Sequence, residues 1–473
     1  MDGFVGRARE LAQLNRMLER VRRGGRTGRH GHALLIRGRR RVGKSRLAVE
    51  FIERAGVPSL YFAASAQSSL QADLDLFMEV GRQSDLPNAA AFHELEPRTW
   101  DAALRILVAA LPKDRPAVVV LDEMPYLIAR DSGFEGTLQK IFDRELLPLP
   151  VLLLCIGSDL AMMEALNEYG RPFHQRASEM VVPPLSPGDI ASMLALPAAD
   201  AFDAYLISGG LPLILDEWPD EADPFGYLAD AVTDPTSALL VSGERALAAE
   251  FPTDAQARRV LGAIGSGERT YSMIARAAGD MNSASLNRAL GLLAAKRLID
   301  VGLPLSTRPS RETRYAVADP HLRFWLAFLG PYLPEIERGR GDQTLERIRK
   351  SWSSWRGRAI EPVVRESLRR LPSGMLPDGT EEIGGYWTRN NDPEVDLVGG
   401  DRAPIAKSVT MVGSIKWQDN RAFDRHDLAR LLLHRAALPG ADDDTPLVAV
   451  SRTESKLDSL HIFTAEDLLS AWT

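Results

Sequence analysis

The stretch GRRRVGKS, residues 38–45, decides the fold of the N-terminal half of the chain. It consists of Gly38, Arg39, Arg40, Arg41, Val42, Gly43, Lys44 and Ser45. The apolar run before it, residues 32–37, is typical of a buried strand. After it, apolar residues recur at helical spacing, at Leu47, Ala48, Phe51 and Ile52. A G-x-x-x-x-G-K-[ST] pattern between a strand and a helix predicts a loop that binds phosphate groups.

The residue types of this loop indicate its chemistry. Glycines let the backbone N–H groups curve around phosphate oxygens, and the start of the next helix adds the positive end of its dipole. We expect Lys44 to bind the β- and γ-phosphates and the Ser45 hydroxyl to hold Mg²⁺. The predicted contacts with a nucleotide run from Gly38 to Arg46. A glycine turn with a purely structural role is the alternative.

A second apolar run ends in two acids. Residues 117–121 are Ala-Val-Val-Val-Leu, and Asp122 and Glu123 follow. Such a run is typical of a central parallel strand whose carboxyl end faces a ligand. We expect Asp122 to hold Mg²⁺, directly or through water, and Glu123 to orient or deprotonate the attacking water. The alternative is a buried strand that ends in two solvated acids.

A third apolar run, residues 151–156, ends at Gly157 and Ser158. A polar side chain at the tip of a neighbouring strand can sense the γ-phosphate or the attacking water, and Ser158 is the candidate. Serine after glycine is also ordinary turn chemistry. Cys155, inside the run, is expected to be a small core residue rather than a reactive thiol.

Composition limits the class of protein. With 473 residues, of which 45% are apolar and 26% charged, the chain predicts a globular protein of about two to four domains. The net charge of −7 excludes a polycation, although the first fifty residues hold 14 Lys and Arg against 4 Asp and Glu. That local excess suits a polyanion such as a nucleotide or nucleic acid. A solvated basic face is the alternative.

Cysteine usage and hydropathy suggest the compartment. Cys155 is the single cysteine, which excludes an internal disulfide and suggests a reducing compartment. The N-terminus lacks a basic-then-apolar signal, and no apolar run reaches membrane-spanning length. We therefore expect a cytoplasmic protein without a membrane partner.

The N-terminal residues add a resemblance to a known family. Phe4-Val5-Gly6-Arg7, followed by a helix, resembles the N-terminal box of AAA+ ATPases, which lies against the adenine. Together with the three runs above, the first ~240 residues resemble the archaeal-type ATPases, in the STAND branch of AAA+. The resemblance implies a P-loop AAA+ parallel sheet and a nucleotide-dependent switch, with Val5 and Gly6 near the base. It also implies ATP rather than GTP, a distinction that the residues alone do not make, since no base-reading residue is visible.

Two later segments fit the same family. Residues 171–176, RPFHQR, resemble its P-L-Y-G-R segment, with Gln175 in place of the glycine and Arg176 matching the arginine. This likeness implies that Arg176 stabilises charge on the γ-phosphate, in cis or from a neighbouring subunit that associates when ATP binds. A surface arginine bound to a carboxylate is the alternative. Residues 209–213, GGLPL, resemble the family's G-G-x-P segment, which lies near the nucleotide base. The likeness implies that Pro212 contacts the nucleotide.

The pattern divides the chain into four parts, an ATPase core at residues 1–185, a helical lid at 186–245, a winged helix at 246–320 and a C-terminal domain at 321–473. The winged helix is predicted from three helical stretches and a basic hairpin. Apolar stripes mark the three helices, at Ala257, Val260, Leu261 and Ile264, at Met273, Ile274 and Ala278, and at Leu286, Leu290 and Leu293. The hairpin carries Arg308, Arg311 and Arg314.

Nucleic-acid contact by this module stays open. On the expected exposed face of its third helix, Asn287 and Arg288 alone have the chemistry that base edges require. The hairpin arginines could bind the phosphates of double-stranded DNA or another nucleic acid. A packing or regulatory role is an equal alternative.

The C-terminal part resembles the domain often fused to these ATPases, an α/β restriction-endonuclease-like fold of the PD-(D/E)xK type. The likeness rests on Glu361 before a helix, Asp396 in PEVDLV and Lys416 in GSIKW, residues that in this fold bind Mg²⁺ and position water. Ser414 departs from the pattern, which has Glu there, and a neutral hydroxyl is a poor replacement for a carboxylate ligand. Glu394, on the same strand face as Asp396, could partly substitute.

The sequence therefore favours an ATP-hydrolysing switch that uses ATP and Mg²⁺, coupled to a winged helix and a degenerate nuclease-like domain. Two alternatives remain: an ATP-regulated, Mg²⁺-dependent DNA or RNA nuclease, and a non-catalytic binding or interaction protein that a nucleotide stabilises.

Overall fold

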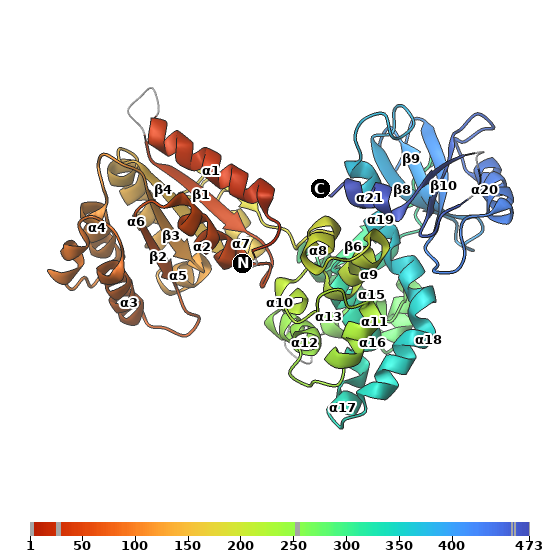
Figure 1. Ribbon diagram of the computed structural model, residues 1–473, viewed down its shortest axis with the longest axis horizontal. Helices are drawn as coiled ribbons and strands as arrows, with labels where there is room; N and C mark the ends of the chain where they lie inside the picture. Colours follow the sequence, from red (N-terminus) through yellow and green to blue (C-terminus); the bar gives the residue numbers. More distant parts are fainter. Residues whose placement is uncertain (1–3, 25–29, 251–255, 456, 458–459, 473) are drawn as a thin grey trace. The chain divides into compact units, whose positions relative to one another are not determined.

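The computed structural model describes residues 4–24, 30–250, 256–455, 457 and 460–472 (Figure 1). The chain divides into two compact units, residues 1–184 and 185–473. The division between them falls next to the predicted boundary of core and lid. The further predicted boundaries, at residues 245 and 320, stay predictions.

The first unit is built on a five-stranded sheet in which all pairs are parallel. In the order β2-β3-β4-β1-β5, its strands are Ser59–Ala63, Ala117–Asp122, Val151–Gly157, His32–Arg37 and Ala177–Val181. Its helices are α1 (Ala8–Arg23), α2 (Lys44–Ala55), α3 (Leu70–Gln83), α4 (Trp100–Ala110), α5 (Met124–Arg130), α6 (Phe134–Ile141) and α7 (Leu160–Ala165), with short helical turns η1 (Ala89–His93) and η2 (Phe142–Leu146). The three strands expected from apolar runs are confirmed.

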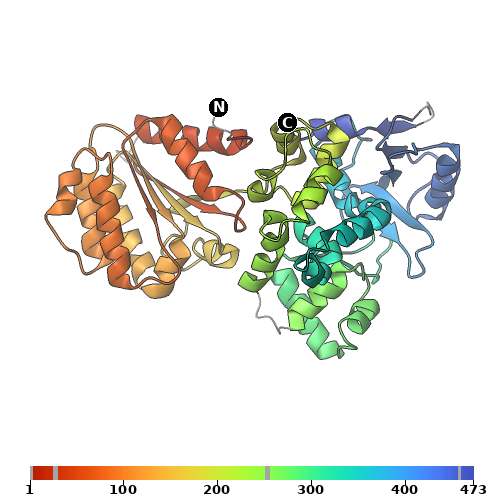
Figure 2. The same ribbon diagram turned by 60° about the horizontal axis from the view of Figure 1, so that its bottom comes forward.

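Helices cover both faces of this sheet (Figures 1 and 2). Alternate strand residues such as Leu35, Val119 and Leu153 pack against α3, α4 and α6 in one core, while α1 and α2 pack on the other face. Every residue of β3 and β4 is buried, because these strands are central and covered twice. That burial explains their continuous apolar sequences.

The strand order brings three functional strand ends together. β4 lies between β1 and β3, with Gly157 level with Arg37 and Cys155 level with Leu121. Because the strands are parallel, their carboxyl ends meet at one edge of the sheet. Cys155 is fully buried, as expected for a core residue, and burial raises the pKa of its thiol to about 12.

The second unit begins with helices. Those before residue 251 are α8 (Pro187–Leu194), α9 (Ala198–Ser208), α10 (Pro212–Leu215), α11 (Pro224–Ala231) and α12 (Ala238–Glu250). Among the described residues, no single helix has both the length and the apolar composition needed to cross a bilayer; α8 and α9 meet these measures only as a pair bent by 109°.

Three helices and an antiparallel strand pair follow, as expected for residues 256–317. They are α13 (Gln256–Gly265), α14 (Tyr271–Ala277), α15 (Ser283–Ala295), β6 (Ile299–Gly302) and β7 (Arg314–Val317). The stripes on α13 and α15 are buried, and Asn287 and Arg288 are exposed. The interpretation of Met273 as a core residue was wrong, since 52% of it is exposed. In the short α14 the neighbouring Ile274 fills the core instead.

The C-terminal part combines long helices with a second five-stranded sheet. Its helices are α16 (Pro320–Phe328), α17 (Leu333–Ile336), α18 (Gly341–Ala359), α19 (Glu361–Arg370), α20 (Arg425–Ala437) and α21 (Ala465–Ser470), with the helical turn η3 (Gly330–Tyr332). In the order β12-β11-β10-β9-β8, the strands are His461–Phe463, Leu447–Ser451, Val409–Lys416, Glu394–Gly400 and Glu382–Trp387.

This sheet is mixed, in contrast to the first. β8, β9 and β10 pair antiparallel, whereas β10, β11 and β12 pair parallel. One face packs on α19 and α21, through residues such as Leu397 and Val450. The other face packs on α20 through Val412 and Ala449. The structure therefore contains an α/β domain of the expected class, while its nuclease-like identity stays a prediction.

Candidate functional site

The loop of residues 38–43 connects β1 to the start of α2. Gly43 has a φ of +87° and precedes α2 without a side-chain cap. The first helical hydrogen bond runs from the Leu47 N–H to the Gly43 carbonyl, so the N–H groups of the first turn have no helical acceptor. A side chain at Gly38 would place its Cβ 2.4 Å from the carbonyl oxygen of Val182. The loop therefore has the open amide groups and close packing that phosphate binding requires.

The Lys44 ammonium lies over this loop. Its Nζ donates to the carbonyls of Gly38, at 2.9 Å, and Arg39, at 2.8 Å. Burial lowers the pKa of Lys44, and the nearby Glu123 and Asp122 carboxylates oppose that shift. The structure thus brings the predicted lysine and both predicted acids into one electrostatic group.

Asp122 is held by three donors. Its Oδ2 accepts hydrogen bonds from the Ser45 hydroxyl, at 2.6 Å, and the Tyr61 hydroxyl, at 2.5 Å. Its Oδ1 accepts one from the Glu123 N–H, at 2.8 Å. Burial, followed by the Asp122 charge, raises the pKa of Tyr61, so the phenol remains a donor. Ser45 and Asp122 lie together as predicted, and Tyr61 is a contact that no motif contains.

Glu123 and Ser158 also come together. Glu123 has a left-handed backbone with a φ of +53° and directly precedes α5. Non-glycine residues in this conformation are strained and concentrate at functional sites. The Ser158 hydroxyl donates to Oε2 of Glu123 at 3.0 Å. The tip of β4 therefore supports the predicted base.

The N-terminal box contacts the phosphate loop through Arg7. Gly6 and Arg7 both have positive φ, +74° and +64°, and Arg7 is buried. Its Nη2 donates to the Val42 carbonyl at 2.6 Å. Val5 and Gly6 were assigned to the site from the family likeness, but Arg7, next in the same box, was not. The available signal was the glycine and arginine that directly precede a helix.

Arg176 lies near the amino-terminal ends of the strands, whereas the phosphate loop follows the carboxyl end of β1. It precedes β5, whose first residue, Ala177, is level with Ala33, whereas Val181 is level with Arg37. Four residues of strand separate the two levels, about 13 Å at about 3.3 Å each. The Arg176 guanidinium pairs with Asp143 at 2.9 Å. The structure does not bring Arg176 to Ser158 or to the loop, and its role stays a prediction.

Pro212 is the first residue of α10 and belongs to the second unit. Its assignment to the nucleotide base therefore also stays a prediction.

A second group of acids lies in the C-terminal part. Asp396 on β9 accepts hydrogen bonds from the Ser414 hydroxyl, at 3.0 Å, and the Ile415 N–H, at 2.9 Å. Lys416 pairs with Asp427 of α20 at 2.9 Å. Ser414 thus occupies the place of the missing glutamate as a neutral donor to Asp396.

Arginines compensate the other acids of this group. Glu361, the first residue of α19, pairs with Arg365 at 2.9 Å. Burial is the largest influence on Glu361 and raises its pKa, with Arg365 opposing. Among the described residues, no three His, Cys, Asp or Glu side chains are arranged to hold a metal ion. The nuclease-like set has two carboxylates, Glu361 and Asp396, and the role of Glu361, Asp396 and Lys416 stays a prediction.

Glu394, the acid that could substitute for the missing glutamate, is paired with two arginines in this structure. It pairs with Arg314 at 2.6 Å and with Arg269 at 3.3 Å. Burial raises the pKa of Glu394, but the two arginines outweigh this and leave it below its ordinary value. We call Arg269, Arg314 and Glu394 the arginine clasp. It joins the segment of the helices and hairpin to the C-terminal sheet.

The clasp changes the expected role of the hairpin. Arg314 also lies 4.5 Å from the ring centroid of Trp387 and donates to Asn391 at 2.5 Å. Its guanidinium is thus committed to the C-terminal domain in this structure. Arg308 and Arg311 are exposed and remain available to phosphates.

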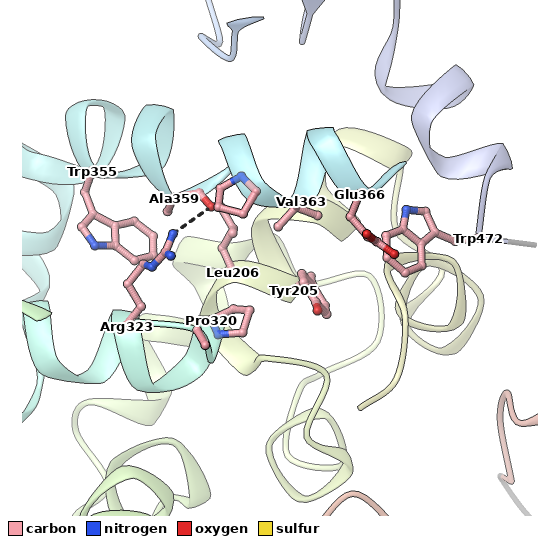
Figure 3. A pocket seen from close by; sticks show the side chains of 11 residues that line it. Tyr205, Leu206, Pro320, Arg323, Trp355, Ala359, Val363, Glu366 and Trp472 are labelled. Atoms are coloured by element: carbon pink, nitrogen blue, oxygen red, sulfur yellow. Dashed lines mark hydrogen bonds between the residues drawn. The ribbon is translucent and has the colours of Figure 1, made fainter. Parts of the chain in front are cut away.

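A cavity of about 120 Å³ lies among α9, α16, α19 and the end of the described chain (Figure 3). Arg323 faces it and donates to the backbone carbonyls of Val317 and Ala359. Its remaining lining is mainly apolar, including Leu206, Trp355 and Val363. Ligand pockets typically measure about 300–1,000 Å³, so this hollow is a packing gap rather than a nucleotide site.

The geometry at the carboxyl edge of the first sheet defines a P-loop nucleotide site on a parallel α/β fold. In agreement, residues 3–154 match the family described as "AAA ATPase domain". Residues 325–428 match a family described as "Archaea bacterial proteins of unknown function". The first unit therefore carries an AAA ATPase domain.

The chain is also similar to individual proteins over most of its length. An uncharacterized protein of Methanocaldococcus jannaschii is 26% identical over 464 residues, which cover 96% of this chain and 97% of that one. A Walker-type ATPase of Pyrococcus abyssi is similar in structure, with 21% identity, a TM-score of 0.49, and coverage of 68% of this chain and 96% of that one. The Aeropyrum pernix ORC2 protein, in ADPNP and ADP complexes, has 15% identity, a TM-score of 0.44, and coverage of 74% and 98%.

Proposed function

We propose that the chain is an ATP-hydrolysing switch of the STAND type. The observation that carries this proposal is the grouping of Lys44, Ser45, Asp122, Glu123 and Ser158 at one edge of a parallel sheet, beside the uncapped start of α2.

Each residue has a distinct part in the proposed reaction. Lys44 binds the β- and γ-phosphates. To do so, its ammonium replaces its hydrogen bonds to the carbonyls of Gly38 and Arg39 with hydrogen bonds to phosphate oxygens. Ser45 and Asp122 hold Mg²⁺, which neutralises phosphate charge when bound. Glu123 orients the attacking water and accepts its proton, and Ser158 keeps the Glu123 carboxylate turned toward the phosphate edge.

Arg176 acts from a neighbouring copy in this proposal. Its position at the amino edge of the sheet, paired with Asp143, supports action in trans rather than in cis. ATP binding would then favour self-association, since the arginine completes the site of the next subunit.

The second unit is proposed to receive the signal and to contact nucleic acid. The exposed Asn287 and Arg288 on α15, and Arg308 and Arg311 after β6, support contact between a winged helix and duplex DNA. The clasp and Ser414 support a degenerate PD-(D/E)xK-like domain that binds or interacts without cleaving. An active nuclease is not the preferred function, because Ser414 stands where the pattern has an acid and because Glu361 and Glu394 pair with arginines.

ATP turnover by the full chain, with and without duplex DNA, tests the proposal. We expect Mg²⁺-dependent release of phosphate that rises when DNA is added and stops in EDTA. Turnover that DNA leaves unchanged would remove the nucleic-acid part. A complete lack of turnover would favour a non-catalytic protein stabilised by nucleotide.

A further inference from the structure

Tyr61 lies beside the nucleotide site although no motif contains it. It belongs to the edge strand β2, level with Val120 of β3. Asp122 lies two residues further along β3, so the phenol extends along the sheet toward the carboxyl edge. There its hydroxyl donates to Oδ2 of Asp122 at 2.5 Å.

The Asp122 carboxylate depends on few supports. Ser45 and Tyr61 donate to the same oxygen, and one backbone N–H donates to the other. Ser45 comes from α2 and is itself a candidate Mg²⁺ ligand. Tyr61 is therefore the one side chain among these donors that has no proposed contact with the metal and can hold the carboxylate in both the free and the bound protein.

We propose that Tyr61 is a positioning residue for Mg²⁺: its hydroxyl holds Asp122 in the orientation in which this carboxylate supports the metal that accompanies ATP. The inference rests on the proposed function, because it assigns Tyr61 to the same site. Partners of metal ligands fix ligand orientation, and their removal typically lowers metal affinity by about 10–100-fold.

The chain offers a matched control in Tyr126. This tyrosine lies on α5 at the same edge, and its hydroxyl accepts a hydrogen bond from Nη2 of Arg40 at 3.0 Å. It has no hydrogen bond to Asp122 among the described contacts. Tyr61→Phe and Tyr126→Phe each remove one hydroxyl from the site, but Tyr61→Phe alone releases Asp122.

The test measures the affinity of the full-length chain for ATP by calorimetry, once in excess Mg²⁺ and once in EDTA. The ratio of the two affinities reports the contribution of the metal without any catalytic step. In Tyr61→Phe we expect this ratio to fall about tenfold, with the affinity in EDTA unchanged. In Tyr126→Phe we expect the wild-type ratio, because any effect through Arg40 acts equally with and without metal. Asp122→Asn serves as the reference for the ratio that remains when the Asp122 carboxylate charge is removed.

The outcomes separate the two proposals. A wild-type ratio in Tyr61→Phe would overturn the role of Tyr61 and leave the ATP site intact. An equal loss of affinity in Mg²⁺ and in EDTA would also overturn it, because it would show a structural role. A wild-type chain that does not bind ATP would remove the proposed function, and the inference with it.

Discussion

The nucleotide site of the first unit and the acid group of the second both collect carboxylates at strand ends, but the partners of these carboxylates differ. Asp122 and Glu123 accept hydrogen bonds from neutral donors, the hydroxyls of Ser45, Tyr61 and Ser158 and one backbone N–H. In the second unit, Glu361 and Glu394 pair with arginines, whereas the Asp396 carboxylate accepts hydrogen bonds from the Ser414 hydroxyl and the Ile415 N–H.

The difference indicates which site can bind a cation. A carboxylate supported by neutral donors keeps its charge for a metal ion or a proton. A carboxylate in an ion pair with arginine is already compensated, and a metal would have to displace the arginine at a desolvation cost. The comparison therefore distinguishes Asp122 and Glu123 from Glu361 and Glu394 by the charge of their partners.

The largest expected effect concerns Glu123. Glu123→Gln should lower ATP turnover by about 10²–10⁴-fold, the usual contribution of a general base, while ATP still binds. Glu361→Gln, the matched change in the second unit, should leave turnover near the wild-type rate. Phosphate release and ATP affinity of both variants check this. Equal losses in the two variants would erase the distinction between the sites.

The second largest effect is expected for Lys44→Ala. Loss of a charged hydrogen bond to phosphate should weaken ATP binding by about 1.5–3 kcal/mol, measurable by calorimetry. Arg54→Ala is a suitable control, because Arg54 lies on the same helix and pairs with Glu50. An unchanged affinity in Lys44→Ala would contradict the assignment of the loop.

Glu394→Gln should act on stability rather than on turnover. It leaves Arg269 and Arg314 close together without their shared carboxylate, which should cost about 1–3 kcal/mol, between the values for exposed and buried pairs. Glu382→Gln, which breaks a longer pair with Arg369 at 3.8 Å, should cost about 0–1 kcal/mol. Denaturant unfolding checks both, and a smaller effect for Glu394 than for Glu382 would argue against the clasp.

A smaller effect is expected when the pH is lowered, where Glu394 and Glu361 should change the free energy of unfolding in opposite directions. The pKa of folded Glu394 lies below its ordinary value, so its stabilisation is present above about pH 4.3 and is lost as the pH falls through the depressed pKa. The pKa of folded Glu361 is raised, so its ionisation destabilises the fold as the pH rises through that range.

Unfolding of the wild type, Glu394→Gln and Glu361→Gln between pH 3 and 7 measures these slopes. The cost of Glu394→Gln should shrink toward low pH. The free energy of unfolding of Glu361→Gln, relative to that of the wild type, should decrease as the pH falls. Slopes of the same sign would show that the two acids do not have different environments.

The smallest expected effect is a null result. Wild type and Lys416→Ala should show the same background nicking of plasmid DNA in Mg²⁺ or Mn²⁺, because Lys416 pairs with Asp427 and Glu361 pairs with Arg365. Cleavage by the wild type that disappears in Lys416→Ala would restore the nuclease alternative.

Short-range patterns predicted the first unit well. The loop of residues 38–45, the acids after β3 and the serine after β4 each stand directly beside a strand whose apolar sequence shows its burial. The order of the strands, which the structure shows, then decides which ends meet. Glu123 and Ser158 came together for this reason.

Contacts between distant residues could not be read in the same way. Tyr61 is 61 residues before Asp122, and Arg314 is 80 residues before Glu394. Neither pair leaves a spacing pattern, because each depends on tertiary packing. Arg176 shows a related limit: its motif identified the residue but carried no information about which edge of the sheet it occupies.

The buried position of Cys155 in the centre of β4 has a practical consequence. The thiolate is the form that attacks thiol reagents, and a pKa of about 12 keeps it scarce near neutrality. Since this is the one cysteine of the sequence, a cysteine introduced at an exposed position of either unit becomes the single labelling site. Fluorophores or spin labels can then test whether nucleotide moves either unit in an otherwise native chain, while slow modification of Cys155 itself times the opening of the central sheet.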